Sequence, residues 1–162
     1  MGVDATNEPT CAREYFENAK SAQRAIDRRL TALDEMRARE QVRAQRYDRI
    51  GGGKGGVSDP MRATVERMDA EDAARAELAQ LYSIVDDARA VCSGVRVANP
   101  QNREWGDVLE LRYCEDMDWR GVANAMVASE RQCRAWHNAA LNFVDSVGLA
   151  RAREGMGQAQ LL

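Results

Sequence analysis

A cysteine and the chain's one histidine lie four residues apart, at Cys133 and His137. Residues four apart share one face of a helix, so this pair could supply two ligands to a metal ion. A zinc site needs four such ligands, and Cys11, Cys92 and Cys114 form no second close pair. We therefore expect no metal and no cofactor, and we expect reduced, buried cysteines in a cytoplasmic protein.

The same two side chains are the most reactive ones that the sequence brings near each other. Catalysis needs several tuned groups that converge in a pocket, and Cys133 and His137 have no evident third member. We therefore do not expect an enzyme.

A glycine-rich segment, Gly-Gly-Gly-Lys-Gly-Gly at 51–56, invites comparison with a phosphate-binding loop. Such a loop has a glycine where this chain has Asp48, and a serine or threonine where it has Gly55. No strand is predicted before it. The segment therefore favours a flexible hinge between helices.

Two long helices are predicted on either side of this hinge. The first runs over 10–50, with Thr10 as its N-cap and an apolar stripe in steps of three and four residues. The second starts at Pro60, a residue suited to a first helical turn, and ends near Gly94. We expect the two to form an antiparallel hairpin over 10–94, with its hinge at 51–58.

The two predicted helices carry opposite charge. Residues 10–50 hold ten basic and seven acidic side chains, a net charge of +3, whereas 59–92 hold four basic and eight acidic ones, a net charge of −4. Opposite signs favour pairing within the hairpin or between two hairpins of a homodimer. Because a lone hairpin buries little apolar surface, we expect it to pack on the C-terminal part or to self-associate.

Three shorter helices are predicted after the hairpin. The first spans about 100–114, after the cap-then-proline pair Asn99–Pro100, and the second spans 119–126 after the cap Asp118. Ser129 and the glutamine three residues later form a capping box for the last helix, which ends near Gly148. This arrangement is typical of a helix-turn-helix, although an ordinary three-helix packing unit has the same spacing.

The stretch VLELRYCEDMDWRGVANAMVASERQCRAWHNAAL, residues 108–141, resembles the fourth conserved region of bacterial sigma factors. The matching positions are Leu111, Arg112, Tyr113, Val122, Ala123, Met126, Ser129, Cys133, Ala140 and Leu141. With its helical hairpin and glycine hinge, the whole chain also resembles small phage-encoded regulators of the ArpU and RinA kind.

This resemblance implies a DNA-binding transcriptional regulator of phage or prophage genes, in the cytoplasm of a bacterial host. Arg131 or Arg134 would donate two hydrogen bonds to a guanine edge, and Gln132 would contact adenine or a phosphate. His137 and Arg120 are candidates for phosphate contacts. The full set of predicted DNA-binding residues is Arg120, Ser129, Glu130, Arg131, Gln132, Arg134, Ala135, His137 and Asn138.

The turn between the last two helices holds Val127 where glycine or asparagine is usual. A β-branched residue with positive φ is costly, so the sequence predicts a turn that differs in shape.

The last helix carries little net charge for a DNA-binding element. Residues 129–141 have a net charge of +1, from Arg131 and Arg134 against Glu130. Because affinity for DNA comes mostly from neutralised phosphates, we expect a dimer, or RNA polymerase as a partner, to strengthen binding. Two other functions stay open: a small terminase-like packaging protein, and a polymerase-binding module with little DNA contact.

The composition agrees with an all-α protein. Apolar residues make up 44% of the chain and charged residues 30%, with only three prolines. No run of 18 apolar residues is present, and the first ten residues do not resemble a secretion signal. We therefore predict no membrane partner, and four segments: a disordered tail 1–9, the hairpin 10–94, a helix-turn-helix unit 99–148 and a flexible tail 149–162.

Overall fold

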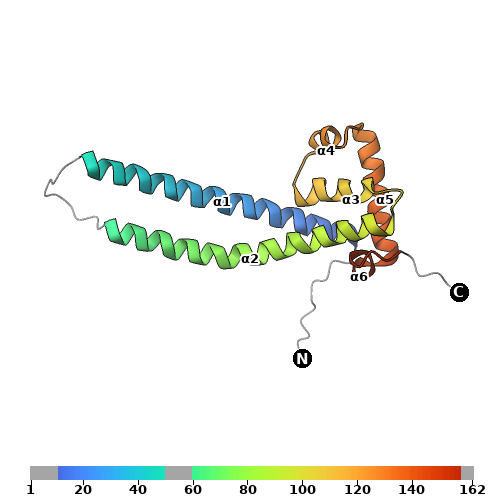
Figure 1. Ribbon diagram of the computed structural model, residues 1–162, viewed down its shortest axis with the longest axis horizontal. Coiled ribbons are helices and arrows are strands. Elements are labelled where there is room, and N and C mark those ends of the chain that lie inside the picture. The colour runs from blue at the N-terminus through green and yellow to red at the C-terminus, as the bar shows by residue number, and fades with distance from the viewer. Residues whose placement is uncertain (1–10, 50–59, 158–162) are drawn as a thin grey trace, which may run out of the picture. The chain divides into compact units, whose positions relative to one another are not determined.

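The computed structural model describes residues 11–49 and 60–157, and these residues fold entirely as helices and turns (Figure 1). The elements are α1 (Ala12–Arg49), α2 (Pro60–Ala98), α3 (Glu104–Leu109), the π-helical turn η1 (Glu110–Cys114), α4 (Trp119–Met126), α5 (Glu130–Val147) and α6 (Leu149–Arg153). The predicted all-α class is therefore confirmed. The predicted tail 1–9, the cap Thr10 and the hinge 51–58 lie outside the described residues. Of the helices described, none is long and apolar enough to span a membrane.

The chain divides into two compact units, each containing a stretch of both long helices. Unit 1 is formed by residues up to Arg24 together with those from Tyr82 onward, and it holds every helix after α2. Unit 2 is formed by Ala25–Leu81. This division differs from the predicted ranges 10–94 and 99–148.

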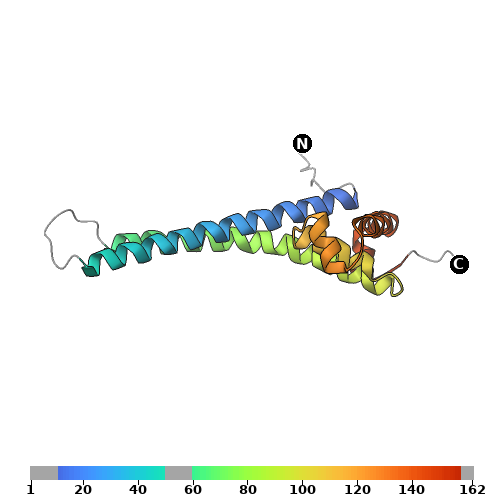
Figure 2. The same cartoon turned by 90° about the horizontal axis from the view of Figure 1, so that it is seen from above.

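In unit 2, α1 and α2 run antiparallel and side by side (Figures 1 and 2). Arg37 Nε lies 3.0 Å from Glu71, and Arg29 Nη2 lies 2.8 Å from Glu77. These contacts pair later residues of α1 with earlier residues of α2, as the predicted antiparallel hairpin requires.

Unit 1 holds most of the buried apolar side chains. Phe16 of α1 contacts the ring of Tyr113, with the ring centroids 5.4 Å apart, and both side chains are buried. Helix α5 packs against both α3 and α4. The cysteines are free thiols, and only Cys11 is not fully buried.

Helix α2 does not end near Gly94, as predicted, but continues to Ala98. A Cβ atom at Gly94 would overlap the carbonyl oxygen of Ala152 and would lie 2.8 Å from its carbonyl carbon. Gly94 is therefore not a helix stop. It is the place where the backbone of α6 approaches α2 too closely for any side chain.

The predicted flexible tail 149–162 is wrong for Leu149–Arg153, which form α6. Ala152 is fully buried, and Arg153 Nη2 lies 2.7 Å from Asp87 of α2. Asp87 also accepts a hydrogen bond from the hydroxyl of Tyr15 in α1. Burial and this carboxylate together raise the pKa of Tyr15, so the hydroxyl remains a donor that links three helices.

Asn99 ends α2 and does not start the next helix. Its side-chain Nδ2 donates to the carbonyl of Val95 at 2.9 Å, and the following residues form turns. Helix α3 therefore begins at Glu104, later than the predicted start at Pro100. It continues into η1, where the N–H of Glu115 donates to the carbonyl of Glu110 five residues earlier.

We expect Gly94→Ala to lower the free energy of unfolding by about 2–3 kcal/mol. The added methyl group on α2 would overlap the backbone of α6 and force the two helices apart. Urea unfolding followed by circular dichroism measures this change. Gly157→Ala is the matched control, since a Cβ there meets nothing within 4 Å, and it should change stability by less than about 0.5 kcal/mol. Equal stability of the two variants would contradict the close packing of α6 on α2.

Candidate nucleic-acid interface

Helices α4 and α5 begin at the predicted caps. Asp118 Oδ1 accepts a hydrogen bond from the N–H of Gly121 at 2.7 Å, and Ser129 Oγ accepts one from the N–H of Gln132 at 3.1 Å. Helix α5 ends at Gly148, also as predicted, and this glycine has a φ of 86°. Because caps act within a few residues, these boundaries follow from local sequence.

The turn between α4 and α5 is a Schellman motif. The N–H of Ala128 donates to the carbonyl of Ala123 at 3.1 Å, and the N–H of Val127 lies 3.4 Å from the carbonyl of Asn124. Val127 has φ 53° and ψ 46°, the left-handed conformation in which glycine is the usual residue. The turn therefore has the shape that is usual with glycine or asparagine at this position. The predicted change of shape is wrong.

A small apolar cluster fixes α5 on α4 and α3. Its buried members are Val108, Val122 and Cys133. Partly buried side chains surround them, namely Leu111, Met117, Trp119, Ala123, Met126, Ala128 and Trp136. The cluster leaves the opposite side of α5 in solvent.

The exposed face of α5 holds most of the predicted DNA-binding residues. Glu130, Arg131, Gln132, Arg134, Ala135 and Asn138 are exposed, as are the cap Ser129 and, on α4, Arg120. These side chains occupy the first three turns of α5 and the first turn of α4. Such a face offers hydrogen-bond donors and acceptors of the kinds that read base edges.

His137 is the exception, because the fold buries it. Its side chain is only 4% exposed, and Nε2 lies 2.7 Å from the hydroxyl of Tyr113. Nδ1 lies 3.2 Å from Oδ1 of Asn138, an acceptor, so the proton resides on Nδ1 and Nε2 accepts from the tyrosine. This corrects the prediction that His137 contacts a DNA phosphate: its role is in the core.

Two guanidinium groups lie over one indole ring at the start of α4. The Cζ atoms of Arg112 and Arg134 are 4.9 and 4.8 Å from the ring centroid of Trp119. Neither arginine forms an ion pair with a carboxylate in the described parts of the chain, and Arg112 donates to the carbonyl of Met117 at 2.8 Å. Two unneutralised charges held in place by an aromatic ring can bind a phosphate.

The sequence did not identify Arg112 and Trp119 as site residues. Arg112 lies in η1 and Trp119 in α4, so their contact with Arg134 depends on how three elements pack. The resemblance to sigma factors included Arg112 as a matching position but gave no reason to place it beside α5.

One acidic residue at the corner before α4, Asp116, pairs with α1. Asp116 has a φ of 53° and accepts from Nε of Arg24 at 3.0 Å, while Lys20 Nζ lies 4.0 Å away. Burial, together with the positive charges of Arg112 and Arg24, lowers the pKa of Lys20. Asp116 therefore joins this corner to two basic side chains of α1.

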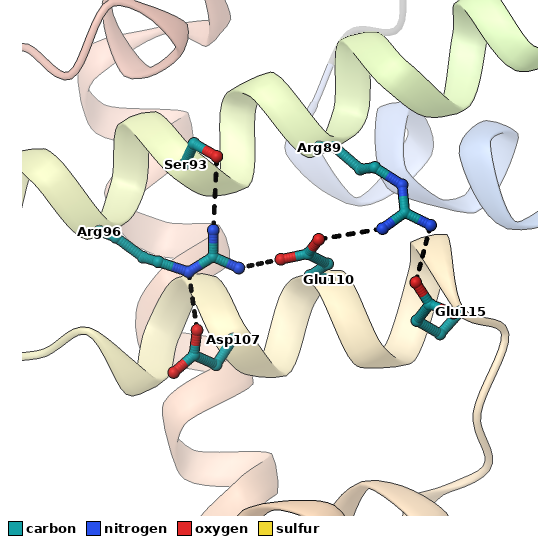
Figure 3. A network of polar contacts seen from close by, with 6 residues as sticks. All are labelled: Arg89, Ser93, Arg96, Asp107, Glu110 and Glu115. Atoms are coloured by element: carbon teal, nitrogen blue, oxygen red, sulfur yellow. Dashed lines mark hydrogen bonds and ion pairs between the residues drawn. The ribbon is translucent and has the colours of Figure 1, made fainter.

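Helix α3 and η1 are held to α2 by a chain of ion pairs, drawn in Figure 3. Arg96 Nε lies 2.7 Å from Asp107, and its Nη2 contacts Glu110, the same carboxylate that lies 3.0 Å from Arg89. Arg89 also lies 2.7 Å from Glu115. These pairs fix the orientation of the helix on which α5 packs.

Cys133 and His137, the two side chains whose spacing suited a metal ion, have other surroundings in the structure. Cys133 is buried in the apolar cluster, and His137 is turned to Tyr113 and Asn138. Among the residues that the structure describes, no group of three or more histidine, cysteine, aspartate or glutamate side chains could hold a metal ion.

Comparisons with known proteins gave no match, whether to a protein-family model, to a curated protein or to a solved structure.

Val127→Gly should raise the free energy of unfolding by about 1 kcal/mol, because it relieves the left-handed strain of a β-branched residue. The side chain is 92% exposed, so little packing is lost. Thermal and urea unfolding measure the gain. Val127→Ala, which keeps a Cβ atom, is the control and should gain less. A loss of stability in Val127→Gly would contradict this interpretation.

His137 should make the fold sensitive to mild acid. Burial is the main cause that lowers its pKa in the folded chain below the usual 6.5, aided by the charges of Arg13 and Arg112, while Asn138 and Glu17 oppose the shift. The unfolded chain then binds a proton that the folded chain does not, so stability is full above about pH 6.5 and falls as the pH drops below it.

Urea unfolding between pH 8 and pH 5 measures this loss, whose slope cannot exceed about 1.4 kcal/mol per pH unit for one proton. Because the chain has a single histidine, His137→Gln should remove the slope between pH 6.5 and 5.5. A wild-type stability that stays constant over this interval would contradict the buried, neutral imidazole.

Proposed function

We propose that this chain is a DNA-binding transcriptional regulator of phage or prophage genes, which acts in the cytoplasm of a bacterial host. The observation that carries the proposal is the exposed polar face of α5, presented by a capped short helix and a tight left-handed turn. This geometry suits a helix that enters the major groove of double-stranded DNA.

Arg131, Gln132 and Asn138 are the proposed readers of base edges, because their side chains are exposed and have the donor patterns that distinguish bases. Arg134 is held on Trp119, so its guanidinium is preorganised and loses less side-chain freedom on binding. Arg112, on the same ring, and Arg120 are proposed phosphate contacts that set the position of α5 on the duplex.

Because the α5 face has a low net charge, its affinity for DNA needs binding energy from a further contact. We propose that the chain acts as a dimer, which would place two α5 helices on successive turns of DNA. RNA polymerase is the second candidate partner, and a polymerase-binding role with little DNA contact is the second candidate function. The net charge of +1 over residues 129–141 favours this second function over a packaging role.

Mobility shift on fragments of the chain's own genomic neighbourhood tests the proposal. We expect a discrete complex that competitor DNA does not remove, and we expect Arg131→Ala/Arg134→Ala to weaken it at least about tenfold, since one good bidentate contact contributes about 1–3 kcal/mol.

Arg28→Ala/Arg75→Ala removes two exposed arginines of unit 2 and is the matched control, with affinity expected to stay within about twofold. No shift at low salt, where phosphate contacts are strongest, would overturn direct DNA binding. Copurification of RNA polymerase in that case would favour the second function.

A further inference from the structure

Two buried thiols of unit 1 lie in contact with each other, although they belong to different helices. Cys92 of α2 and Cys114, the last residue of η1, are fully buried free cysteines, and their side chains are hydrogen-bonded to each other. Neither thiol is part of the α5 face or of the apolar cluster around Cys133. Sulfur atoms in such contact need only a short movement to form a disulfide bond.

Ion pairs on both sides hold these two thiols together. Arg89 and Arg96 lie about one turn before and one turn after Cys92, on the same side of α2. Both arginines contact the carboxylate of Glu110, which lies four residues before Cys114 (Figure 3). The packing of unit 1 therefore keeps α2 and η1 close at the position of the thiols.

The surroundings make Cys114 the more nucleophilic of the two thiols. A hydrogen bond from the thiol of Cys92 lowers the pKa of Cys114, and the positive charge of Arg89 acts in the same direction. Burial and the carboxylates of Glu110 and Glu115 oppose this shift. The same hydrogen bond, together with burial, raises the pKa of Cys92. One thiol thus gains thiolate character beside a second that keeps its proton, as a nucleophilic and a resolving cysteine require.

A groove beside the thiols favours a small oxidant. Arg96, Glu110 and Glu115 line this groove, whose volume is about 370 Å³, and the same charged side chains act on the two thiols. Because neither thiol is exposed, a bulky oxidant such as oxidised glutathione cannot contact the sulfur atoms in the folded chain. Hydrogen peroxide is scarcely larger than water and needs only a small movement of the groove side chains.

We infer that Cys92 and Cys114 form a redox site, at which hydrogen peroxide converts the two thiols to a disulfide that links α2 to η1. The Cys114 sulfur attacks one peroxide oxygen, so that an S–O bond forms, the O–O bond breaks, and water leaves with the thiol proton. The Cys92 sulfur then attacks the sulfenic acid, so that an S–S bond forms, the S–O bond breaks, and a second water leaves. The thiols lose two electrons in total, and the peroxide is reduced to water.

This redox site goes beyond the proposed function and does not depend on DNA binding. In a reducing cytoplasm such disulfides are transient and serve to sense oxidants. Helix η1 also carries Arg112, whose guanidinium lies over Trp119. The disulfide would therefore cross-link α2 to the element that supports the candidate interface.

Mass spectrometry of the folded full chain, digested after treatment with hydrogen peroxide, is the test. We expect a linked pair of peptides that contains Cys92 and Cys114 and is lighter than the two thiol peptides by two hydrogen atoms. Dithiothreitol should separate the pair. Oxidised glutathione should leave both thiols unmodified, and a mixed disulfide at either cysteine would overturn the choice of peroxide.

Variants test the roles of the two thiols. Cys92→Ala should stop at the sulfenic acid of Cys114, which dimedone traps. Cys133→Ala is the matched control, since Cys133 is also fully buried, and it should form the disulfide at the wild-type rate. Arg89→Gln should slow disulfide formation at neutral pH because the thiolate fraction of Cys114 falls, whereas Arg28→Gln, at an exposed position of unit 2, should not.

The wild-type measurement needs no substitution, so it is decisive even if Cys92→Ala fails to fold. Cys92 and Cys114 thiols that survive a peroxide dose which oxidises Cys11, the cysteine that is not fully buried, would overturn the inference. A disulfide that appears only after the chain is unfolded in urea would overturn it as well. Failure of the chain to bind DNA would instead overturn only the proposed function.

Discussion

The arrangement of unit 1 depends on two close backbone contacts along one turn of α2. At Gly94 the carbonyl of Ala152 in α6 occupies the space of a side chain, and at Gly106 of α3 a Cβ atom would lie 2.6 Å from the carbonyl oxygen of Cys92. Helices from two later parts of the chain therefore approach α2 at distances that only glycine allows. Ion pairs from Arg89 and Arg96 then fix the rotation of α3 about this contact. Since α5 packs on α3, the candidate interface depends on this turn of α2 although it contains none of its residues.

A second line of contacts leads from the core to the surface of α5. Tyr113 is buried against Phe16 and bonds to His137, whose ring lies edge-on to Trp119 at 5.0 Å between centroids. Trp119 in turn supports the guanidinium groups of two arginines. The positions of these charges are therefore set by aromatic packing and not by carboxylate partners, which leaves them available to an anion. Loss of the neutral imidazole would disturb packing and interface together, because both use the same ring.

Unit 2 follows a different physical rule. Its helices contact each other partly through ion pairs of arginine and glutamate, and Ile26 and Leu78 are buried in it, whereas Val42, Val65 and Met68 are exposed. Ionic contacts between partly exposed side chains contribute little to stability, whereas exposed valine and methionine gain free energy from burial.

The sequence by itself determined the features that depend on neighbours within a few residues. Asp118, Ser129 and Gly148 fix the ends of α4 and α5, and apolar steps of three and four place two long helices in an all-α chain. Only the tertiary structure decided the roles of residues whose contacts come from distant parts of the sequence. Gly94 looked like a helix stop but is a packing site, Asn99 caps the helix before it, and α6 formed where a tail was expected. His137 was predicted to face DNA but is buried beside Tyr113. A local pattern cannot reveal such contacts, because their free energy comes from groups that meet only when the helices pack.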